Sequence, residues 1–250
     1  MIRRRLTACA VIVAAPLASI GAGGAVALSA TRAAATEGPV LTRLSDERKL
    51  SRWAYPAREA MIRTAPDEQA RVIDRLKILT EDRLPNTYLL LQRSVGPGQQ
   101  NWVRLRVPGR PNGRTGWVPR DALGGFHRVS TAVTVDRRKL RVTVHRAGRV
   151  VFSAPVGIGK GSTPTPAGRF WIREKFKVGG YGSYGPRALG TSAYAPGLTD
   201  WPSGGVIGLH GTDEPGLVPG RPSHGCMRLR NADVLRFYRL VPVGTPLRIR

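Results

Sequence analysis

The chain carries one cysteine outside its first ten residues, Cys226, in the stretch RPSHGCMRLRN. His224 lies two positions before it, and His210 ends the apolar stretch VIGLH further upstream. A thiol becomes nucleophilic when a base or a cation helps it lose its proton, and its attack on a carbonyl needs donors for the oxyanion that forms. These residue types and spacings fit a thiol nucleophile with a histidine base.

Each neighbour of the cysteine can be given a role in that chemistry. Gly225 allows a tight backbone turn, so we expect the amides of Gly225 and Cys226 to face the oxyanion. His210, at a strand end, could take the thiol proton while the carbonyl of Gly211 orients its other ring nitrogen. The positive charge of Arg228 would favour the thiolate.

Other interpretations of the same residues remain open from the chemistry alone. Cys226 could be a small buried hydrophobic residue. His210, His224 and Cys226 could bind zinc, although their spacing lacks the short ligand pairs of structural zinc sites. We interpret Asn231 as the N-cap of the predicted helix NADVLRFYRL and give it no further function.

The elements that must position these residues are predicted to be mainly β. Alternation in TAVTV, LRVTVH and RVVFSAPV predicts three strands in a meander. VIGLH predicts a short buried strand that ends at His210, and only one or two short helices are expected. Residues 178–205 are rich in Gly, Pro and aromatic residues, which predicts a long functional loop that covers the site.

A separate module is predicted over residues 51–124. NWVRLRV and GWVPRDAL read as strands joined by a hairpin turn at Asn112-Gly113. The pattern resembles the bacterial SH3-like barrels carried by many cell-wall enzymes. Tyr88, Trp102 and Trp117 could line a ligand groove in it or form its core.

The N-terminus and the charge predict an exported protein. MIRRR followed by an apolar, small-residue stretch is typical of a signal peptide or N-terminal anchor over residues 1–30, with cleavage after Ala27 or Ala35. Residues 31–50 read as a linker. Cleavage after Ala27 would lower the formal charge from +24 to +21. We expect anionic cell-wall polymers as non-specific partners, no nucleic acid, and membrane contact only through an uncleaved N-terminus.

Two stretches, HGTDEPGLVPGRPSHGCMRLRN and TPTPAGRFWI, together resemble the L,D-transpeptidase (YkuD) family over residues 127–250. The resemblance implies a β-rich catalytic domain that remodels peptidoglycan, needs no cofactor or metal, and acts on stem peptides. Transferred to this sequence, it makes Cys226 the acylated nucleophile, His210 its base and the Gly211 carbonyl the group that orients the base.

The same resemblance assigns supporting roles to the rest of the motif. Ser223 and His224 would shape the pocket, Gly225 with Cys226 would form the oxyanion hole, and Arg228 would fix the loop or face a substrate carboxylate. A lid tyrosine joins the oxyanion site in some relatives. The candidates are Tyr181, Tyr184 and Tyr194.

The function expected from these features is that of an exported, monomeric transpeptidase. Its thiolate attacks the L-D amide of a stem tetrapeptide, D-alanine leaves, and the thioester passes to an acceptor amine. An L,D-carboxypeptidase with water as acceptor and a non-catalytic wall-binding protein are the alternatives. A papain-like endopeptidase places its cysteine before its histidine, whereas His210 precedes Cys226.

Overall fold

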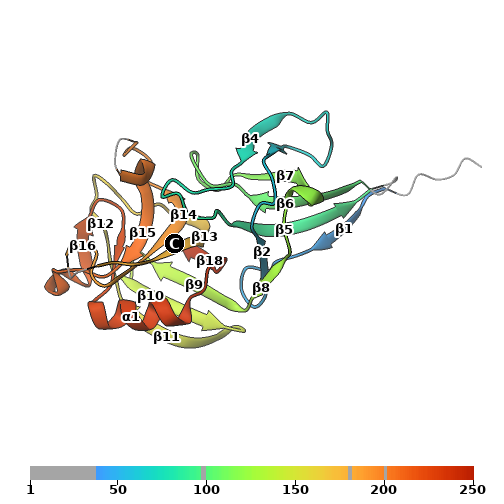
Figure 1. Cartoon of the computed structure of the whole chain (residues 1–250). Helices are drawn as coiled ribbons and strands as arrows, with labels where there is room; N and C mark the ends of the chain where they lie inside the picture. Colours follow the sequence, from blue (N-terminus) through green and yellow to red (C-terminus); the bar gives the residue numbers. More distant parts are fainter. Residues whose placement is uncertain (1–37, 97–99, 180–181, 200–201) are drawn as a thin grey trace, which may run out of the picture. The chain divides into compact units, whose positions relative to one another are not determined.

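The structure is a computed structural model that describes residues 38–96, 100–179, 182–199 and 202–250. The predicted signal peptide or anchor and Tyr181 lie outside the described residues. Within the described residues, no helix is both long and apolar enough to cross a membrane. From residue 37 onward the chain forms one unit with two β-sheets (Figure 1).

The first sheet holds eight antiparallel strands in the order β4-β3-β7-β6-β5-β2-β8, with β1 paired to β5. These strands are β1 (Val40–Arg43), β2 (Ser51–Ala54), β3 (Ala60–Arg63), β4 (Val72–Leu76), β5 (Tyr88–Val95), β6 (Asn101–Arg106), β7 (Thr115–Pro119) and β8 (His127–Val129). The predicted β6–β7 hairpin is confirmed, and Gly113 in its loop has a φ of +89°. Tyr88, Trp102 and Trp117 are all buried, so they form core rather than a ligand groove.

The predicted linker over residues 31–50 differs from the structure in its described part. Val40–Arg43 form β1, whose side chains are all exposed, and Leu44 is buried in the core of the first sheet. β1 is held by main-chain pairing to β5 and buries neither face. Its residues therefore need not alternate between polar and apolar, so the sequence pattern could not indicate this strand.

The second sheet holds ten strands in the order β11-β10-β9-β18-β13-β14-β15-β17-β12-β16. They are β9 (Thr131–Asp136), β10 (Arg141–Arg146), β11 (Arg149–Pro155), β12 (Gly157–Gly159), β13 (Gly168–Lys177), β14 (Arg187–Tyr194), β15 (Val206–His210), β16 (Gly220–Ser223), β17 (Met227–Arg228) and β18 (Pro246–Ile249). The predicted meander β9–β10–β11 is confirmed. Short 3-10 turns η2 (Arg120–Ala122), η3 (Pro202–Gly205) and η4 (Pro215–Leu217) lie in the connections.

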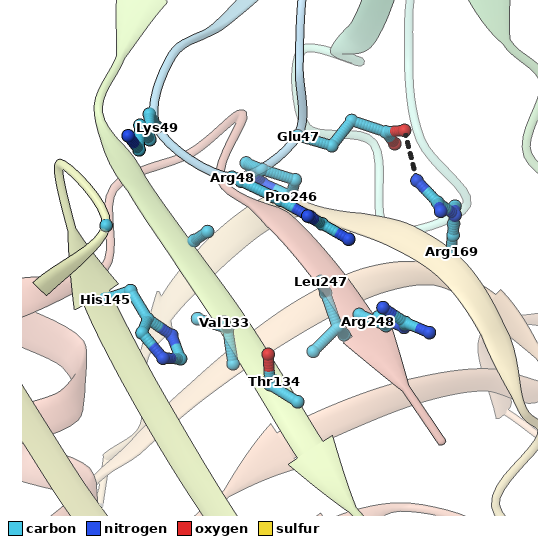
Figure 2. A pocket seen from close by; sticks show the side chains of 12 residues that line it. Glu47, Arg48, Lys49, Val133, Thr134, His145, Arg169, Pro246, Leu247 and Arg248 are labelled. Atoms are coloured by element: carbon cyan, nitrogen blue, oxygen red, sulfur yellow. Dashed lines mark hydrogen bonds and ion pairs between the residues drawn. The ribbon is translucent and has the colours of Figure 1, made fainter. Parts of the chain in front are cut away.

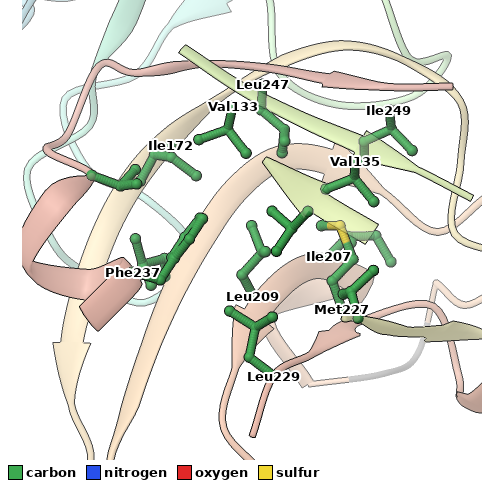
Figure 3. Close-up of a cluster of buried hydrophobic side chains, with 14 of the residues drawn as sticks. Val133, Val135, Ile172, Ile207, Leu209, Met227, Leu229, Phe237, Leu247 and Ile249 are labelled. Atoms are coloured by element: carbon green, nitrogen blue, oxygen red, sulfur yellow. The ribbon is translucent and has the colours of Figure 1, made fainter. Parts of the chain in front are cut away.

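One hydrophobic core supports this sheet and the site. Figure 3 shows side chains from β9, β15, β17 and β18 converging with Phe237 of α1 (Asn231–Leu240). The helix buries Val234 and Phe237, which are three residues apart and therefore lie on one face. Leu209 and Met227 are both fully buried and opposite each other in register. The strands that carry the candidate base and nucleophile are thus fixed on the core.

Buried side chains of β13 connect the two sheets. The indole N–H of Trp171 donates to the carbonyl of Thr87 at 3.0 Å. The guanidinium of Arg173, 1 % exposed, donates from Nη1 to Glu81 at 2.9 Å and from Nε to Asn86 at 3.1 Å. A buried charge needs such a complete set of partners to offset its desolvation. The N-terminal module is therefore held against the second sheet by specific polar contacts.

Candidate active site

Cys226 lies in the turn between β16 and β17 and is half-buried. Its Sγ accepts a hydrogen bond from the backbone N–H of Gly208 in β15 at 3.4 Å. Gly225 has a φ of +128°, and a Cβ there would meet Ile207 at 2.7 Å. The turn therefore requires glycine immediately before the nucleophile, because any other residue would be strained and would collide with β15.

The hydroxyl of Ser223 holds this turn in shape. It donates to the carbonyl of Cys226 at 2.6 Å and accepts the N–H of Gly225 at 3.1 Å. That second bond corrects the prediction that the Gly225 amide serves the oxyanion hole, because the amide is already used. The N–H of Cys226 has no partner among the residues that the structure describes, so it is the remaining backbone donor of the turn.

Thr165, in the TPTPAGRFWI segment, stabilises the turn through its side-chain hydroxyl. Its hydroxyl donates to the carbonyl of Gly225 at 2.6 Å and accepts the N–H of Gly159 at 2.9 Å. Thr165 is 1 % exposed, so both bonds are shielded from water. Thr165 therefore has a structural role, because it fixes the main chain next to Cys226.

His210 ends β15, and the parallel pairing of β15 with β17 places it opposite Arg228. Its Nδ1 lies 2.6 Å from the carbonyl oxygen of Gly211, as the sequence predicts. A carbonyl only accepts, so Nδ1 carries the proton and Nε2 keeps its lone pair. Burial lowers the pKa of His210 to about 4, with the nearby Arg228 contributing, which keeps the ring neutral at pH 7.

Arg228 favours the thiolate, as expected from the sequence, but burial of the thiol acts more strongly in the opposite direction. Burial raises the pKa of Cys226, and this outweighs the lowering by the Gly208 N–H and by Arg228. The guanidinium of Arg228 is paired with Glu214 at 2.7 Å, which reduces its effect on the thiol. The resting pair is therefore a neutral thiol and a neutral imidazole.

Arg228 nevertheless keeps one free donor. Its Nε is buried and has no partner within the described part of the chain. The ion pair with Glu214 fixes the loop that follows β15, as one of the two predicted roles requires. His224 is exposed and lines the same cavity as Cys226.

Asn231 has a role that differs from the predicted helix cap. The helix begins at Asn231 itself, and the capping position is held by Arg230 without a side-chain bond. The Oδ1 of Asn231 instead accepts the N–H of Thr212 at 2.9 Å. A Cβ on Gly211 or on Gly185 would come within 2.4 Å of that oxygen. Asn231 thus fixes the chain directly after His210, which capping preferences alone could not reveal.

The structure distinguishes the two candidate tyrosines that it describes, Tyr184 and Tyr194. Tyr194 is buried, and its hydroxyl contacts Glu81 and Arg173. Tyr184 is 45 % exposed and its ring centroid lies 4.6 Å from that of His210. Burial raises the pKa of Tyr184, with a contribution from Cys226, so its hydroxyl stays protonated and can donate.

Two cavities reach the candidate nucleophile. One has a volume of about 150 Å³ and extends toward Leu198 and His224. The other has a volume of about 360 Å³ and extends toward Asp82 and Lys177. Both are lined by Tyr184, Val206, His210 and Cys226. The thiol can therefore be approached from two sides.

The loop between β6 and β7 supports one wall of the smaller cavity. Arg110 donates to the carbonyls of Ala195 at 2.8 Å and of Leu198 and Gly204, both at 3.0 Å. Asn112 exchanges two hydrogen bonds with the backbone of Tyr194, at 2.8 and 3.0 Å. The prediction of one long loop over residues 178–205 is wrong in its middle, because Arg187–Tyr194 form strand β14 between β13 and β15. Most of β14 is continuously buried, so it shows no alternation in the sequence. The partners in the β6–β7 loop lie more than 80 positions away and could not be predicted from the sequence.

The fold and the site define a class: a β-rich catalytic domain with a cysteine and a carbonyl-oriented histidine at one cavity. The family model described as the L,D-transpeptidase catalytic domain, YkuD, matches residues 130–249. The putative L,D-transpeptidase YqjB of Bacillus subtilis is 31% identical over 124 residues, which are 45% of this chain and 67% of the relative. The chain belongs to the L,D-transpeptidase (YkuD) family.

A second curated relative agrees with this membership. The putative L,D-transpeptidase YkuD of Bacillus subtilis is 29% identical over 185 residues, covering 72% of this chain and 96% of the relative. A solved L,D-transpeptidase from Mycobacterium tuberculosis is 16% identical, covers 60% of this chain and 90% of that chain, and has a TM-score of 0.40. The match to the putative L,D-transpeptidase YkuD of Bacillus licheniformis covers 63% of that relative's length.

Proposed function

We propose that the chain is an exported L,D-transpeptidase that cross-links peptidoglycan through a thioester on Cys226. The observation that supports it is the pairing of β15 with β17, which brings His210 and Cys226 to the same two cavities. Gly211 fixes the tautomer in which Nε2 is the proton acceptor. Nε2 has no partner among the described residues, so it is available to the thiol.

The first step is acylation. The Sγ of Cys226 attacks the carbonyl carbon of the L-D amide while its proton moves to Nε2 of His210. Because both groups are neutral at rest, the thiol proton must move to His210 during acylation. The tetrahedral intermediate collapses, the C–N bond breaks, and the imidazolium protonates the departing amine of D-alanine. A thioester remains.

The second step transfers the acyl group. The side-chain amine of another stem attacks the thioester carbon and gives its proton to the neutral His210. The C–S bond breaks, and the imidazolium returns the proton to the sulfur. The donor and the acceptor need separate approaches to one thiol, which the two cavities offer.

We assign the oxyanion donors to the N–H of Cys226 and the hydroxyl of Tyr184. The first is the free amide of the motif turn, and the second belongs to a protonated tyrosine that lines both cavities. Donors that are already in place lower the cost of charge development in a site that excludes water.

Location and partners follow from the same proposal. Stem peptides of peptidoglycan are the substrates, and the enzyme works in the cell wall as a monomer, secreted or held by its N-terminus. The formal charge of +24 supports retention on polymers rich in carboxylate and phosphate. The SH3-like module would contribute to this retention.

The experiment that tests the proposal is incubation of the exported form with a stem tetrapeptide, followed by mass spectrometry of intact protein and products. A thioester on Cys226 together with a cross-linked dimer supports the transpeptidase. Tripeptide alone would identify an L,D-carboxypeptidase instead. A protein that forms neither adduct nor product is not an enzyme for this substrate, and wall binding would then be its function.

The acylation rate is expected to have an unusual acidic limb. His210 must be neutral, and its pKa is lowered to about 4, so acylation should remain near its maximum at pH 5.5 and fall only as the pH approaches 4. The folded ring resists protonation, so stability should drop by about 1.4 kcal/mol per pH unit between the unfolded pKa of about 6.5 and the folded pKa of about 4, and this contribution should not change further below pH 4. Single-turnover acylation is measured against pH, with circular dichroism at each point. An acidic limb near pH 6.5 would contradict the burial argument.

Arg110→Ala is expected to lower kcat/KM for the donor peptide by at least about tenfold, because the wall of the smaller cavity loses three backbone contacts and small displacements of a substrate are costly. Alkylation of Cys226 by iodoacetamide should be unchanged, since the thiol and its base stay in place. Arg104→Ala is the matched control, because Arg104 bonds only within the module, to Gln92 and Thr115. Equal losses of kcat/KM in both variants would mean that the loss comes from a less stable N-terminal module and not from the cavity wall.

A further inference from the structure

A second cavity region lies away from Cys226, on the outer face of the second sheet. It has a volume of about 310 Å³ and is lined by residues 47–49, by Gly148, and by strands β9, β10, β13 and β18. Figure 2 shows these side chains gathered around β9 and β18, with the Glu47–Arg169 pair at one side and His145 at the other. Nothing in the proposed reaction uses this region, which we call the outer groove.

The outer groove is strongly basic. Five of its lining side chains are nitrogen bases: Arg48, Lys49, His145, Arg169 and Arg248. Its one acid is Glu47, whose carboxylate is already held by Arg106 at 2.6 and 2.9 Å and by Arg169 at 3.1 Å. These guanidinium groups lower the pKa of Glu47, so it stays ionised. Arg48, Lys49 and Arg248 have no acidic partner among the described residues.

The register of the sheet places like charges side by side. Arg169 of β13 lies directly opposite Arg248 of β18 in an antiparallel pair. Opposed like charges destabilise a sheet. Glu47 is shared between Arg106 and Arg169, and no carboxylate within the described structure pairs with Arg248. An anion in the outer groove would remove this cost.

The loop that closes the outer groove is built rigidly. The Oδ1 of Asp46 accepts the N–H groups of Arg48 and Lys49, both at 2.7 Å, and of Leu50 at 3.0 Å. Glu47 has a φ of +58°, a left-handed conformation that is costly for a residue other than glycine. The clamp on its carboxylate maintains that conformation. The loop therefore presents Arg48 and Lys49 from a preorganised backbone.

The floor of the outer groove is less polar. Ala132 of β9 and Pro246 of β18 are buried at its base, and Thr134 lies opposite Arg248 in the parallel pair of these strands. A ligand that matches the whole cavity combines an oxyanion that accepts several hydrogen bonds with a small uncharged body. Arginine donates in the forked geometry that suits phosphate.

We propose that the outer groove is a binding site for a phosphate-bearing ligand, specifically a phosphodiester that links polyol or sugar units. The phosphate lies between Arg48, Lys49 and Arg248, and its polyol neighbour covers the floor of the groove. A phosphodiester carries one negative charge, as a carboxylate does, but its tetrahedrally arranged oxygens can accept hydrogen bonds from several cationic side chains at once. The site holds the chain on its ligand and takes no part in the chemistry at Cys226.

The test uses the whole protein without its signal sequence and two phosphate probes, inorganic phosphate and a synthetic oligo(glycerol phosphate). Binding is measured by calorimetry at fixed ionic strength, and the proton signals of the His145 ring are followed by NMR. The triple variant Arg48→Gln, Lys49→Gln, Arg248→Gln is expected to bind the oligomer at least tenfold more weakly. The matched control Arg71→Gln, Arg128→Gln, Arg239→Gln removes the same charge from exposed positions outside the groove.

A second measurement needs no binding assay. Arg248→Gln is expected to raise the melting temperature in chloride, because the like-charge pair with Arg169 disappears. Phosphate at equal ionic strength should raise the melting temperature of the unchanged chain and not that of the triple variant. Three outcomes would overturn the proposal. The triple and control variants could lose affinity for the oligomer equally, or oligoglutamate could bind more tightly than oligo(glycerol phosphate). The ring proton signals of His145 could also fail to shift when either probe is added.

Discussion

Cys226→Ala is expected to abolish thioester formation and to reduce product formation by roughly 10⁴-fold or more, since every covalent step passes through Sγ. The fold should be unaffected. Cys226 is only half-buried, and the turn that carries it is held by Ser223, Thr165 and Gly225 through hydroxyl and backbone groups. Mass spectrometry after incubation with tetrapeptide should show neither adduct, dimer nor tripeptide.

Cys226→Ser is the matched control for this result. It keeps a side chain of similar shape with a far weaker nucleophile, so the neutral His210 cannot activate it in the way available to the thiol. Circular dichroism and the melting temperature of both variants should match those of the unchanged chain. Product formation by the folded Cys226→Ala variant would show that another nucleophile, or bound water alone, attacks the substrate.

The strands that position the site could be predicted because each buries one face. Val133 and Val135, and Val142 and Val144, are buried with half-exposed residues between them, and this alternation is visible in the sequence. β1 has four exposed residues and no such pattern, so it could not be predicted from the sequence. Main-chain pairing alone leaves little trace in residue types.

The chemical core of the site was also predictable, because it depends on a short motif. The contact between His210 and the carbonyl of Gly211 joins neighbouring residues and follows from their order. The use of the Gly225 amide by Ser223 was not predictable, since a side-chain rotamer decides it. The contact of Asn231 with Thr212 depends in the same way on how the helix packs against the loop.

Protonation states required the fold as well. Arg228 could be recognised from the sequence as a cation near the thiol, and it does lower the pKa of Cys226. Burial of the thiol outweighs that effect, so the net pKa is raised. Desolvation depends on the whole surrounding structure, so the resting state of the pair could not be obtained from the motif.

His210→Ala is expected to slow acylation by about 10² to 10⁴-fold, the range that a positioned general base supplies. Burial raises the pKa of the Cys226 thiol, so attack requires a base, and His210 lines both cavities that reach the thiol. The ring of His210 is 5 % exposed, and its removal leaves a space next to Tyr184. Added imidazole should therefore restore part of the acylation rate, which a purely structural role would not allow.

His224→Ala separates the two histidines of the motif. His224 is exposed and lies in the turn, whereas His210 is held by Gly211 with its free nitrogen available. We expect the loss in His224→Ala to stay below about tenfold, or about 1.4 kcal/mol in barrier height. Single-turnover acylation rates with one donor peptide provide the comparison, and His145→Ala, in the outer groove, controls for the loss of an imidazole. A larger loss in His224→Ala than in His210→Ala would make His224 the base and would require the catalytic turn to rearrange when substrate binds.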